Sequence, residues 1–370
     1  MQKLAPYVPG RPIEDVEREF GIAGAVKLAS NENPLGPSPK AVAAALAVTP
    51  SVHVYPDGSA TFLRRALAER HGVPAEQIVI GSGSCELIDI CTRTFVDPGE
   101  EVVVPAGIFR MFPVAAGRAG ATFVEVPTKP GHVPDIDALL RRIGPATKLV
   151  ALANPNNPTG AYVPRADLDR FFGALPGHVV AVVDEAYFEF ARETADYPDA
   201  LDYLRAGHNV AVLRTFSKIY GLAGLRIGYA FAAPDIAAAM NKVREPFNTT
   251  SVAQAAALAA LTDDEHRERT LALVREERAF LAGELGRRGA VVHPSLGNFL
   301  LVELPVPFGP IEPEFARRGV ILRPMGGWGF PLAFRLSVGR HDENLRFLAA
   351  FDELLDAGSL GLIAGASASA

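Results

Sequence analysis

The sequence predicts an α/β protein in which a mostly parallel sheet, covered on both faces, is joined to a smaller α+β domain. Short apolar runs alternate with longer amphipathic or alanine-rich segments, which is the pattern of a parallel sheet with connecting helices. Several runs are apolar at consecutive positions, as residues 179–183 illustrate, and such runs indicate strands buried on both faces. The alternation ends near residue 245, where a different order of elements begins.

The elements can be placed in order along the chain. Strands are expected at residues 77–81, 101–105, 122–127, 148–153, 178–183 and 209–213. Helices are expected between them, at residues 61–70, 86–95, 108–119, 136–143 and 165–174. Beyond residue 245 we expect helices at 253–261, 263–288 and 342–355, and strands at 299–303, 319–323 and 334–337.

This order of elements predicts two domains. We place a large domain at residues 31–245, and a smaller one at residues 1–30 together with 246–357. Residues 358–370 are small and apolar without periodicity, and we expect them to form a disordered tail.

Composition narrows the class of protein. The 370 residues carry 36 Lys and Arg against 42 Asp and Glu, and this net charge of −6 argues against nucleic-acid or anionic-membrane partners. Two cysteines cannot build a disulfide framework, which favours a reducing, cytoplasmic compartment. The N-terminus lacks a signal-peptide core, and the longest charge-free stretch, 246–262, is too polar to span a bilayer. No residue pattern indicates a metal site.

Groups able to bind a ligand follow four of the expected strands, and ligands of open α/β sheets bind beyond the carboxyl ends of strands. Residues 81–86 form a Gly/Ser turn that opens a helix, where free N–H groups attract an anion such as phosphate. An Asn/Pro turn follows at 154–160. Asp184 and Lys218 follow two further strands, and a desolvated lysine can form a Schiff base. Each feature alone has an ordinary explanation as a turn, a helix cap or a surface charge, but their ordered combination predicts a ligand site.

These motifs resemble those of fold-type I pyridoxal phosphate (PLP) enzymes, and most closely those of the histidinol-phosphate aminotransferase family. The resemblance covers almost the whole chain, from residues 6–12 and 28–39 through 55–58 to 334–339. It implies a large domain with a mostly parallel seven-stranded sheet and a smaller α+β domain. The motifs that carry it are Gly83-Ser84-Cys85-Glu86, 154–160, Asp184-Glu185-Ala186-Tyr187, Ser217-Lys218 and Gly224-Leu225-Arg226.

The resemblance also implies roles for individual residues around PLP. Lys218 would bind the cofactor covalently, and Asp184 would pair with the ring nitrogen so that the ring acts as an electron sink. Asn157 and Tyr187 would hydrogen-bond the ring oxygen, and Phe109 would stack on the ring. The catalytic residues would be Lys218, Asp184 and Tyr187. The residues implied for the cofactor phosphate are Ser84, Cys85, Ser217 and Arg226.

A second group of residues is implied for the substrate and for a partner subunit. Tyr55 would reach the cofactor phosphate of the neighbouring subunit, so the active unit would be a homodimer. Arg335 would bind the substrate carboxylate, and Asn31 would lie near it. Tyr7 and Arg323 match positions that the family uses around the substrate, including its phosphate.

The activity implied by the resemblance is ping-pong transfer of an amino group from histidinol phosphate, or a similar amino donor, to 2-oxoglutarate. Lys218 would move the proton from the substrate Cα. Two alternatives on the same scaffold stay open at this point. One is an aromatic or specialised amino-acid aminotransferase, and the other, with weaker support, is a PLP-dependent decarboxylase.

Four departures from the family pattern bear on the donor. Cys85 stands where the family usually has Asp. The aromatic residue assigned to ring stacking, Phe109, comes two positions late, and Phe112 takes the second aromatic place. Thr249-Thr250 stands where Val-Asn is common, and Arg340 where Thr is usual. The sequence therefore leaves the donor open.

Overall fold

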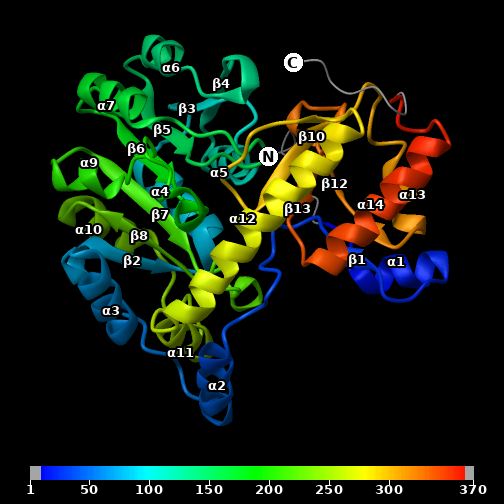
Figure 1. Ribbon diagram of the computed structural model, residues 1–370. Coiled ribbons are helices and arrows are strands. Elements are labelled where there is room, and N and C mark those ends of the chain that lie inside the picture. The colour runs from blue at the N-terminus through cyan, green and yellow to red at the C-terminus, as the bar shows by residue number, and fades with distance from the viewer. Residues whose placement is uncertain (1–9, 363–370) are drawn as a thin grey trace.

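A seven-stranded sheet forms the centre of the larger part of the molecule (Figure 1). The computed structural model describes residues 10–362. The strand order is β2 (Ile78–Gly81), β8 (Gly228–Ala232), β7 (Val210–Thr215), β6 (Val180–Asp184), β5 (Thr147–Ala153), β3 (Glu101–Pro105) and β4 (Thr122–Val126). β8 runs antiparallel to both of its neighbours, and the other six strands run in one direction. The predicted mostly parallel seven-stranded sheet is confirmed.

All six strands expected before residue 245 are present in this sheet, but the apolar pattern missed its seventh strand, β8. This strand follows β7 through a loop, without the long helical segment that separates the other strands. Its sequence, Gly-Tyr-Ala-Phe-Ala, is short and rich in small residues, so composition alone did not mark it. The antiparallel direction follows from this short connection, because a parallel strand needs a long crossover.

Both faces of the sheet are covered by helices, as consecutive apolar residues predict. Successive strand residues point to opposite faces. Ala181 and Val183 of β6 therefore join one core cluster, and Val182 joins the other. The first cluster includes side chains of α2 (Pro39–Val48), α3 (Thr61–His71), α6 (Ile136–Arg142), α7 (Arg165–Ala174), α9 (Leu201–Arg205) and α11 (Ser251–Ala260). The second includes side chains of α4 (Gly83–Phe95), α5 (Met111–Ala119) and α10 (Pro234–Val243).

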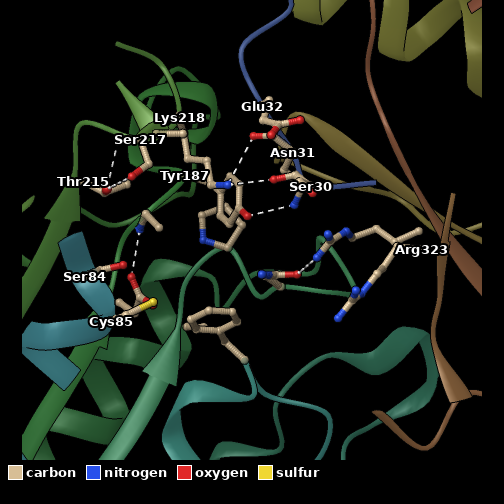
Figure 2. A pocket seen from close by; sticks show the side chains of 18 of the residues that line it. Ser30, Asn31, Glu32, Ser84, Cys85, Tyr187, Thr215, Ser217, Lys218 and Arg323 are labelled. Carbon is tan, nitrogen blue, oxygen red and sulfur yellow. Dashed lines mark hydrogen bonds between the residues drawn. The ribbon is translucent and has the colours of Figure 1, made fainter. Parts of the chain in front are cut away.

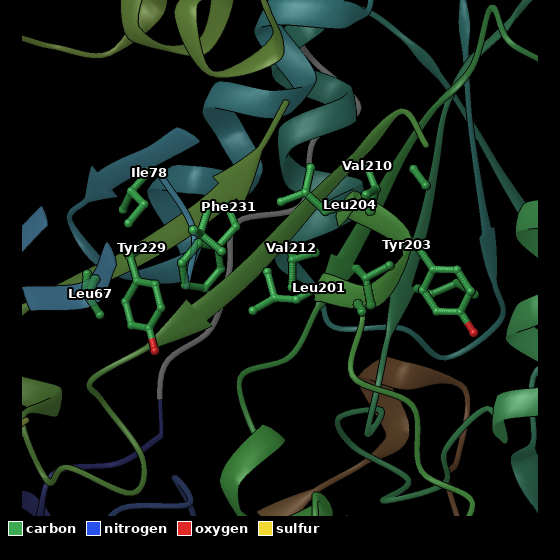
Figure 3. Close-up of a cluster of buried hydrophobic side chains, with 14 of the residues drawn as sticks. Leu67, Ile78, Leu201, Tyr203, Leu204, Val210, Val212, Tyr229 and Phe231 are labelled. Carbon is green, nitrogen blue, oxygen red and sulfur yellow. The ribbon is translucent and has the colours of Figure 1, made fainter. Parts of the chain in front are cut away.

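Figure 3 shows part of the first cluster, where Val212 of β7 and Phe231 of β8 lie with Leu201 and Leu204 of α9. Val212 and Phe231 are fully buried, and the two leucines are nearly so. Each such side chain stabilises the fold by about 1.5–3 kcal/mol relative to leaving it exposed. The rigid sheet that results holds the strand ends, and the loops beyond them, at set positions.

The smaller part of the molecule is built on a four-stranded antiparallel sheet. Its order is β12 (Arg323–Pro324), β13 (Ala333–Ser337), β10 (Phe299–Glu303) and β9 (Val291–Val292). A separate parallel pair joins β1 (Val26–Lys27) to β11 (Val320–Ile321), so the single strand expected at 319–323 is in fact two short ones. The remaining helices of this part are α1 (Ile13–Phe20), α13 (Glu312–Arg317) and α14 (His341–Asp356).

One long helix, α12 (Asp264–Arg287), joins the two parts (Figure 1). Leu271 near its start packs against the first core cluster of the large sheet. Leu281 and Leu285 near its end are buried in the cluster of the smaller sheet. Short helical segments complete the chain at α8 (Phe188–Ala191) and at Thr49–Ser51, Ala75–Gln77, Pro130–His132, Ala223–Leu225 and Gly326–Trp328.

The chain does not pass from the larger to the smaller part of the molecule at residue 245. Helix α11 lies against α2 and α3 and belongs to the core of the large sheet, although it follows that residue. The division at residue 245 stays a prediction. Residues 1–9, with Tyr7, and residues 363–370 of the expected tail lie outside the described residues. Within residues 10–362, no helix combines the length and the apolar character that crossing a membrane requires.

Candidate active site

A cavity of about 230 Å³ opens beyond the carboxyl ends of β5, β6 and β7, where the two parts of the molecule meet (Figure 2). Most of the residues predicted for the site line it, whereas Tyr55 does not. We call its wall from the large sheet and α4 the sheet side, and its wall from residues 29–32 and the smaller sheet the junction side. The predicted residues in the lining are Asn31, Ser84, Cys85, Phe109, Asn157, Asp184, Tyr187, Ser217, Lys218, Arg226, Arg323 and Arg335.

Lys218 points from the loop after β7 toward the junction side (Figure 2). Its Nζ donates hydrogen bonds to the backbone oxygens of Ser30 and Asn31, at 3.1 and 3.2 Å. Burial lowers the pKa of Lys218 to about 8, and the positive charge of Arg335 acts in the same direction. A lysine with such a pKa supplies neutral amine near physiological pH, which both a nucleophile and a general base require.

Asp184 is the last residue of β6 and is only 4% exposed. Its Oδ1 accepts a hydrogen bond from the backbone N–H of Ala186 at 3.1 Å. Burial raises the pKa of Asp184 to about 7, because the charged carboxylate has lost its water. A cationic group placed beside this carboxylate would compensate that cost, as the protonated nitrogen of a pyridine ring does.

The start of α4 forms an anion-binding corner with Arg226. The backbone N–H groups in the first turn of this 13-residue helix, at Ser84 and Cys85, lie where the helix dipole is positive. Gly83 has φ +77°, and a Cβ there would come within 2.5 Å of Arg226 Nη2. Glycine at this position therefore lets the guanidinium lie against the helix start. Arg226 Nη1 also donates to Ser217 Oγ at 3.5 Å and to the Ala223 backbone oxygen at 2.9 Å.

Two residues outside the predicted set orient this corner. Thr215 Oγ1 donates to Ser217 Oγ at 3.0 Å and accepts from the Ser217 backbone N–H at 3.0 Å. Glu86 accepts from the Asn248 side chain at 2.6 Å and from the backbone N–H of Ser82. The segment after residue 245 thus helps to hold the turn that contains Cys85.

Hydrogen bonds join Asn31 on the junction side to Tyr187 on the sheet side. Asn31 Nδ2 donates to the Tyr187 hydroxyl at 2.9 Å. Ser337 Oγ donates to Asn31 Oδ1 at 3.0 Å and accepts from the Asn31 backbone N–H at 2.7 Å. Asn298 Nδ2 donates to the Asn31 backbone oxygen at 3.1 Å. Ser337 and Asn298 were missed as positioning residues. The motif at 334–339 contains Ser337, whereas nothing in the sequence around Asn298 marks it.

Arg335 stands in β13 with its guanidinium turned to the cavity, and it is 6% exposed. It donates to Asn157 Oδ1 at 2.5 Å and to the Ala29 backbone oxygen at 2.7 Å. Arg323, paired with Arg335 across β12 and β13, stacks over the Trp328 ring at 5.2 Å. Figure 2 places Arg323 across the cavity from Ser84 and Cys85. The cavity therefore has a cationic junction side as well as an anion-binding corner.

Several predicted features lie away from the cavity. Phe109 reaches it, but Phe112 is buried in the second core cluster. Thr249 and Thr250 are used locally, in a hydrogen bond with Gln254 and as the N-cap of α11. Arg340 is a largely exposed residue whose charge pairs with Asp342 and Glu343. Of the four departures, Cys85 and the Phe109 shift are the ones that touch the cavity.

Tyr55 is 80% exposed and stacks on Phe247 with ring centroids 4.8 Å apart. Its hydroxyl is outside the cavity of its own chain.

The burial of Cys85 raises the pKa of its thiol, so this side chain is neutral at physiological pH. A neutral side chain at the anion-binding corner avoids repelling a phosphate.

Comparison with known proteins decides the family. The family model for aminotransferases of class I and II matches residues 23–351 of this chain. The chain belongs to this family. A histidinol-phosphate aminotransferase of Anaeromyxobacter sp. (strain Fw109-5) is 50% identical to this aminotransferase over 355 residues, which are 96% of this chain and 97% of the relative. Histidinol-phosphate aminotransferase 1 of Nitrosococcus oceani is 44% identical over 96% of both chains.

A solved structure agrees with these sequence relatives. The histidinol-phosphate aminotransferase of Sinorhizobium meliloti, crystallised with pyridoxal-5'-phosphate, superposes with a TM-score of 0.89 at 30% identity over 96% of each chain. The resemblance inferred from the motifs is confirmed, and so are the fold-type I architecture and the enzyme class. This aminotransferase is a PLP-dependent transaminase.

The residues of this chain fit PLP. The cavity contains Lys218 with a lowered pKa and the buried carboxyl of Asp184, whose charge a protonated ring nitrogen would balance. It also contains the start of α4, where Gly83 leaves room for Arg226 and a phosphate. These groups lie at the ends of adjacent strands of one sheet. No other cavity described in residues 10–362 is lined by a lysine, a buried aspartate and an open helix start together.

Proposed function

We propose that this aminotransferase takes its amino group from histidinol phosphate and passes it to 2-oxoglutarate. The observation that carries the proposal is the pair Arg323 and Arg335 on the junction side, facing the cavity that holds Lys218. Histidinol phosphate has a phosphate and no carboxylate, whereas 2-oxoglutarate has two carboxylates. Both present an anion at a distance from the reacting carbon, and two guanidinium groups bind either anion well. The names of the sequence relatives support the same donor.

In this proposal Lys218 carries the proton between the two reacting carbons. Bound PLP supplies an electron sink for the carbanion at the donor Cα. Lys218 Nζ removes the proton from that Cα as a general base and returns it on the cofactor side. Its hydrogen bonds to the backbone oxygens of Ser30 and Asn31 direct the amine toward the junction side of the cavity.

The neighbouring side chains hold the cofactor in our proposal. Asp184 binds the ring nitrogen and keeps it protonated. Asn157 and Tyr187 bind the ring oxygen, and they are oriented by Arg335 and Asn31. The phosphate is bound by the N–H groups of Ser84 and Cys85 together with Ser217 and Arg226, and Phe109 covers the ring. Tyr7, outside the described residues, is assigned to the substrate by the resemblance alone.

We further propose that the working enzyme is a cytoplasmic homodimer. Ten large apolar side chains are exposed within residues 10–362. Six of them lie in the stretch 42–62, and a seventh, Phe247, stacks on Tyr55 of that stretch. The six are Val42, Leu46, Val52, Val54, Tyr55 and Phe62. Exposed apolar surface of this kind indicates an interface. A second copy seated here would bring Tyr55 to the partner's cavity. The two free cysteines are compatible with a reducing compartment.

The donor is tested with a panel of amino donors and 2-oxoglutarate, in which conversion of the cofactor to its amino form is followed by absorbance. The panel contains histidinol phosphate, histidine, phenylalanine, tyrosine and a basic amino acid. We expect histidinol phosphate to lead in kcat/KM by at least about tenfold, which is roughly 1.4 kcal/mol. A lead by phenylalanine or tyrosine would establish the aromatic alternative, and release of CO₂ without the amino form of the cofactor would indicate decarboxylation.

The shared site is tested by mixing two inactive variants, Tyr55→Ala and Lys218→Ala. A hybrid dimer contains one cavity with an intact Lys218 and an intact Tyr55 from its partner. We expect activity to return after subunit exchange, up to about a quarter of the wild-type value if subunits mix statistically. Mixtures without any recovery, in samples that exchange subunits, would show that Tyr55 acts within its own chain or not at all.

A further inference from the structure

Two histidines and a glutamate meet at the contact between the two sheets, outside the cavity already described. His132 ends the short helical turn Pro130–His132, which follows β4 of the large sheet. His293 follows β9, and Glu303 ends β10, both in the smaller sheet. These residues are far apart in sequence, and Figure 1 shows β4 and β10 in the two different parts of the molecule. Only the tertiary structure brings them together.

The distances between their polar atoms suit a metal ion. His132 Nε2 is 3.4 Å from Glu303 Oε1, and His293 Nε2 is 3.1 Å from the same oxygen. All three donor atoms lie within 4.8 Å of one another. Metal–ligand bonds of about 2.0–2.2 Å at tetrahedral angles place neighbouring ligand atoms about 3.3 Å apart. The two nitrogen–oxygen distances already match this spacing. The two imidazole nitrogens lie within 4.8 Å of each other, and they would have to move closer only if their separation exceeds about 3.3 Å.

The surroundings favour coordination over a simple hydrogen-bonded cluster. His293 Nε2 is buried and makes no hydrogen bond to any described residue, although it lies next to the Glu303 carboxylate. The His132 ring packs edge-on against Phe330, with ring centroids 4.8 Å apart, and lies tilted against the His293 ring, with centroids 4.7 Å apart. His132 also has φ +61°, a left-handed conformation that is unfavourable for a residue with a Cβ. Strained backbone of this kind concentrates at functional sites.

We propose that His132, His293 and Glu303 form a binding site for a divalent transition-metal ion, with zinc the best match. Two imidazole nitrogens and one carboxylate oxygen are a donor set of zinc sites that keep a fourth position for water. Nitrogen donors disfavour calcium and magnesium, which prefer oxygen ligands. The ion and its three ligands would together carry a net charge of +1, because two neutral imidazoles and one carboxylate bind a divalent ion. Water bound at the fourth position would solvate this charge.

Binding would connect the two parts of the molecule directly. The ion would join the segment after β4 to β9 and β10. Phe330, which packs on His132, belongs to the same small apolar cluster as Trp328, the ring that lies under Arg323. A ligand that binds only the folded arrangement stabilises it in proportion to the logarithm of its concentration. The metal is therefore expected to raise the melting temperature and to restrain the loop that supports Arg323.

The test uses the PLP-loaded enzyme after metal removal by a chelator and dialysis. Zn²⁺ is titrated by calorimetry, and Co²⁺ is added in parallel because its visible absorbance reports tetrahedral coordination. We expect one Zn²⁺ per chain at this site. His132→Ala and Glu303→Gln should each weaken binding by at least about tenfold, since each removes one of three protein ligands. The matched control is His178→Ala, which removes an exposed histidine elsewhere on the large domain and should leave the affinity unchanged.

The activity of these variants without metal shows whether weaker Zn²⁺ binding comes from the missing metal ligand or from misfolding of the variant. None of the three positions lines the cavity, so turnover without Zn²⁺ should stay within about twofold of the wild-type value, in keeping with substitutions outside the reacting groups. The proposal is overturned if wild type and His132→Ala bind Zn²⁺ equally, or if the wild type binds no tighter than about 1 mM. Because neither result depends on the amino donor, the outcome is independent of the proposed function.

Discussion

The two sides of the cavity are built in different ways. The sheet side is made by short segments that directly follow strands β6 and β7 and by the first turn of α4. The junction side is made by contacts between residues that are remote in sequence, such as Asn31 with Ser337 and Arg335 with Asn157. A rigid, doubly covered sheet positions the first side, whereas the second depends on how the smaller sheet packs against residues 29–32.

Their electrostatics differ as well. On the sheet side, burial shifts the pKa of Lys218 down and that of Asp184 up, which prepares both groups for proton chemistry. On the junction side, Arg335 is held by the oxygens of Asn157 and Ala29 and presents a permanent positive charge. We propose that the sheet side serves the reaction common to all donors, and that the junction side serves the choice among them.

Lys218→Ala should abolish turnover of every donor. The loss of both the covalent attachment and the general base is expected to lower kcat by at least about 10³-fold, at the upper part of the range for a lost acid–base group. Single-turnover absorbance with histidinol phosphate and with glutamate measures it. A variant that lost one donor and kept the other would break the division between the two sides.

Asp184→Asn should lower kcat/KM for all donors by about a hundredfold, near 2.7 kcal/mol, because a neutral amide no longer stabilises a protonated ring nitrogen. Steady-state kinetics with two unrelated donors checks this. Equal losses are expected for the two, and a loss confined to one donor would contradict the assignment of Asp184 to the common reaction.

The same substitution has the opposite effect on the stability of the cofactor-free protein. The pKa of Asp184 is about 7 when folded, against an ordinary value of 3.8. Between these values the folded chain keeps a proton that the unfolded chain releases, so stability falls as pH rises through this window. Asp184→Asn removes the fall. Urea unfolding should show the variant more stable by about 4 kcal/mol at pH 7, with the two curves converging near pH 4.

Arg335→Lys should act selectively on the junction side. Lysine keeps the charge but loses the planar fork that bonds Asn157 and Ala29 and receives the anion. We expect kcat/KM for histidinol phosphate to fall about thirtyfold, as one or two charge-assisted hydrogen bonds are worth about 1.5–3 kcal/mol. The ratio of kcat/KM for histidinol phosphate to kcat/KM for an aromatic amine without phosphate or carboxylate should fall as well. An unchanged ratio would show that Arg335 does not discriminate donors.

Arg340→Thr should have the smallest effect. The Arg340 side chain is 52% exposed, its ion pairs are on the surface, and it does not line the cavity. The change in unfolding free energy should stay within about 0.5 kcal/mol and kcat/KM within about twofold. A large change in donor preference would contradict the placement of the Arg340 side chain away from substrate binding.

Much of the sheet side could be predicted from the sequence because its residues directly follow, or end, recognisable strands along the chain. Lys218 follows β7 and Asp184 ends β6, so the order of strands along the chain was enough to group them. The strand β8 was missed because it returns without a helix. The strand β1 was missed because a two-residue strand has no periodicity, and its partner β11 was expected only as part of a longer strand at 319–323.

The junction side was predicted only where a family motif named its residues. Arg335 and Asn31 were assigned by resemblance, while Asn298, which donates to the backbone of Asn31, had no sequence signal. A side chain that acts through one hydrogen bond to a distant backbone leaves no pattern in its neighbours. The contact exists because two chain segments pack together, and packing is a property of the folded whole.

By itself, the sequence determined the fold class, the mostly parallel sheet and the identity of the groups at its strand ends, since apolar periodicity and turn residues act over a few neighbouring positions. The tertiary structure alone decided the shifted pKa values, the hydrogen bonds that cross the cavity, and the meeting of His132 with His293 and Glu303. These depend on burial and on the approach of remote segments. No local pattern encodes either, because both arise only when the two sheets are packed against each other.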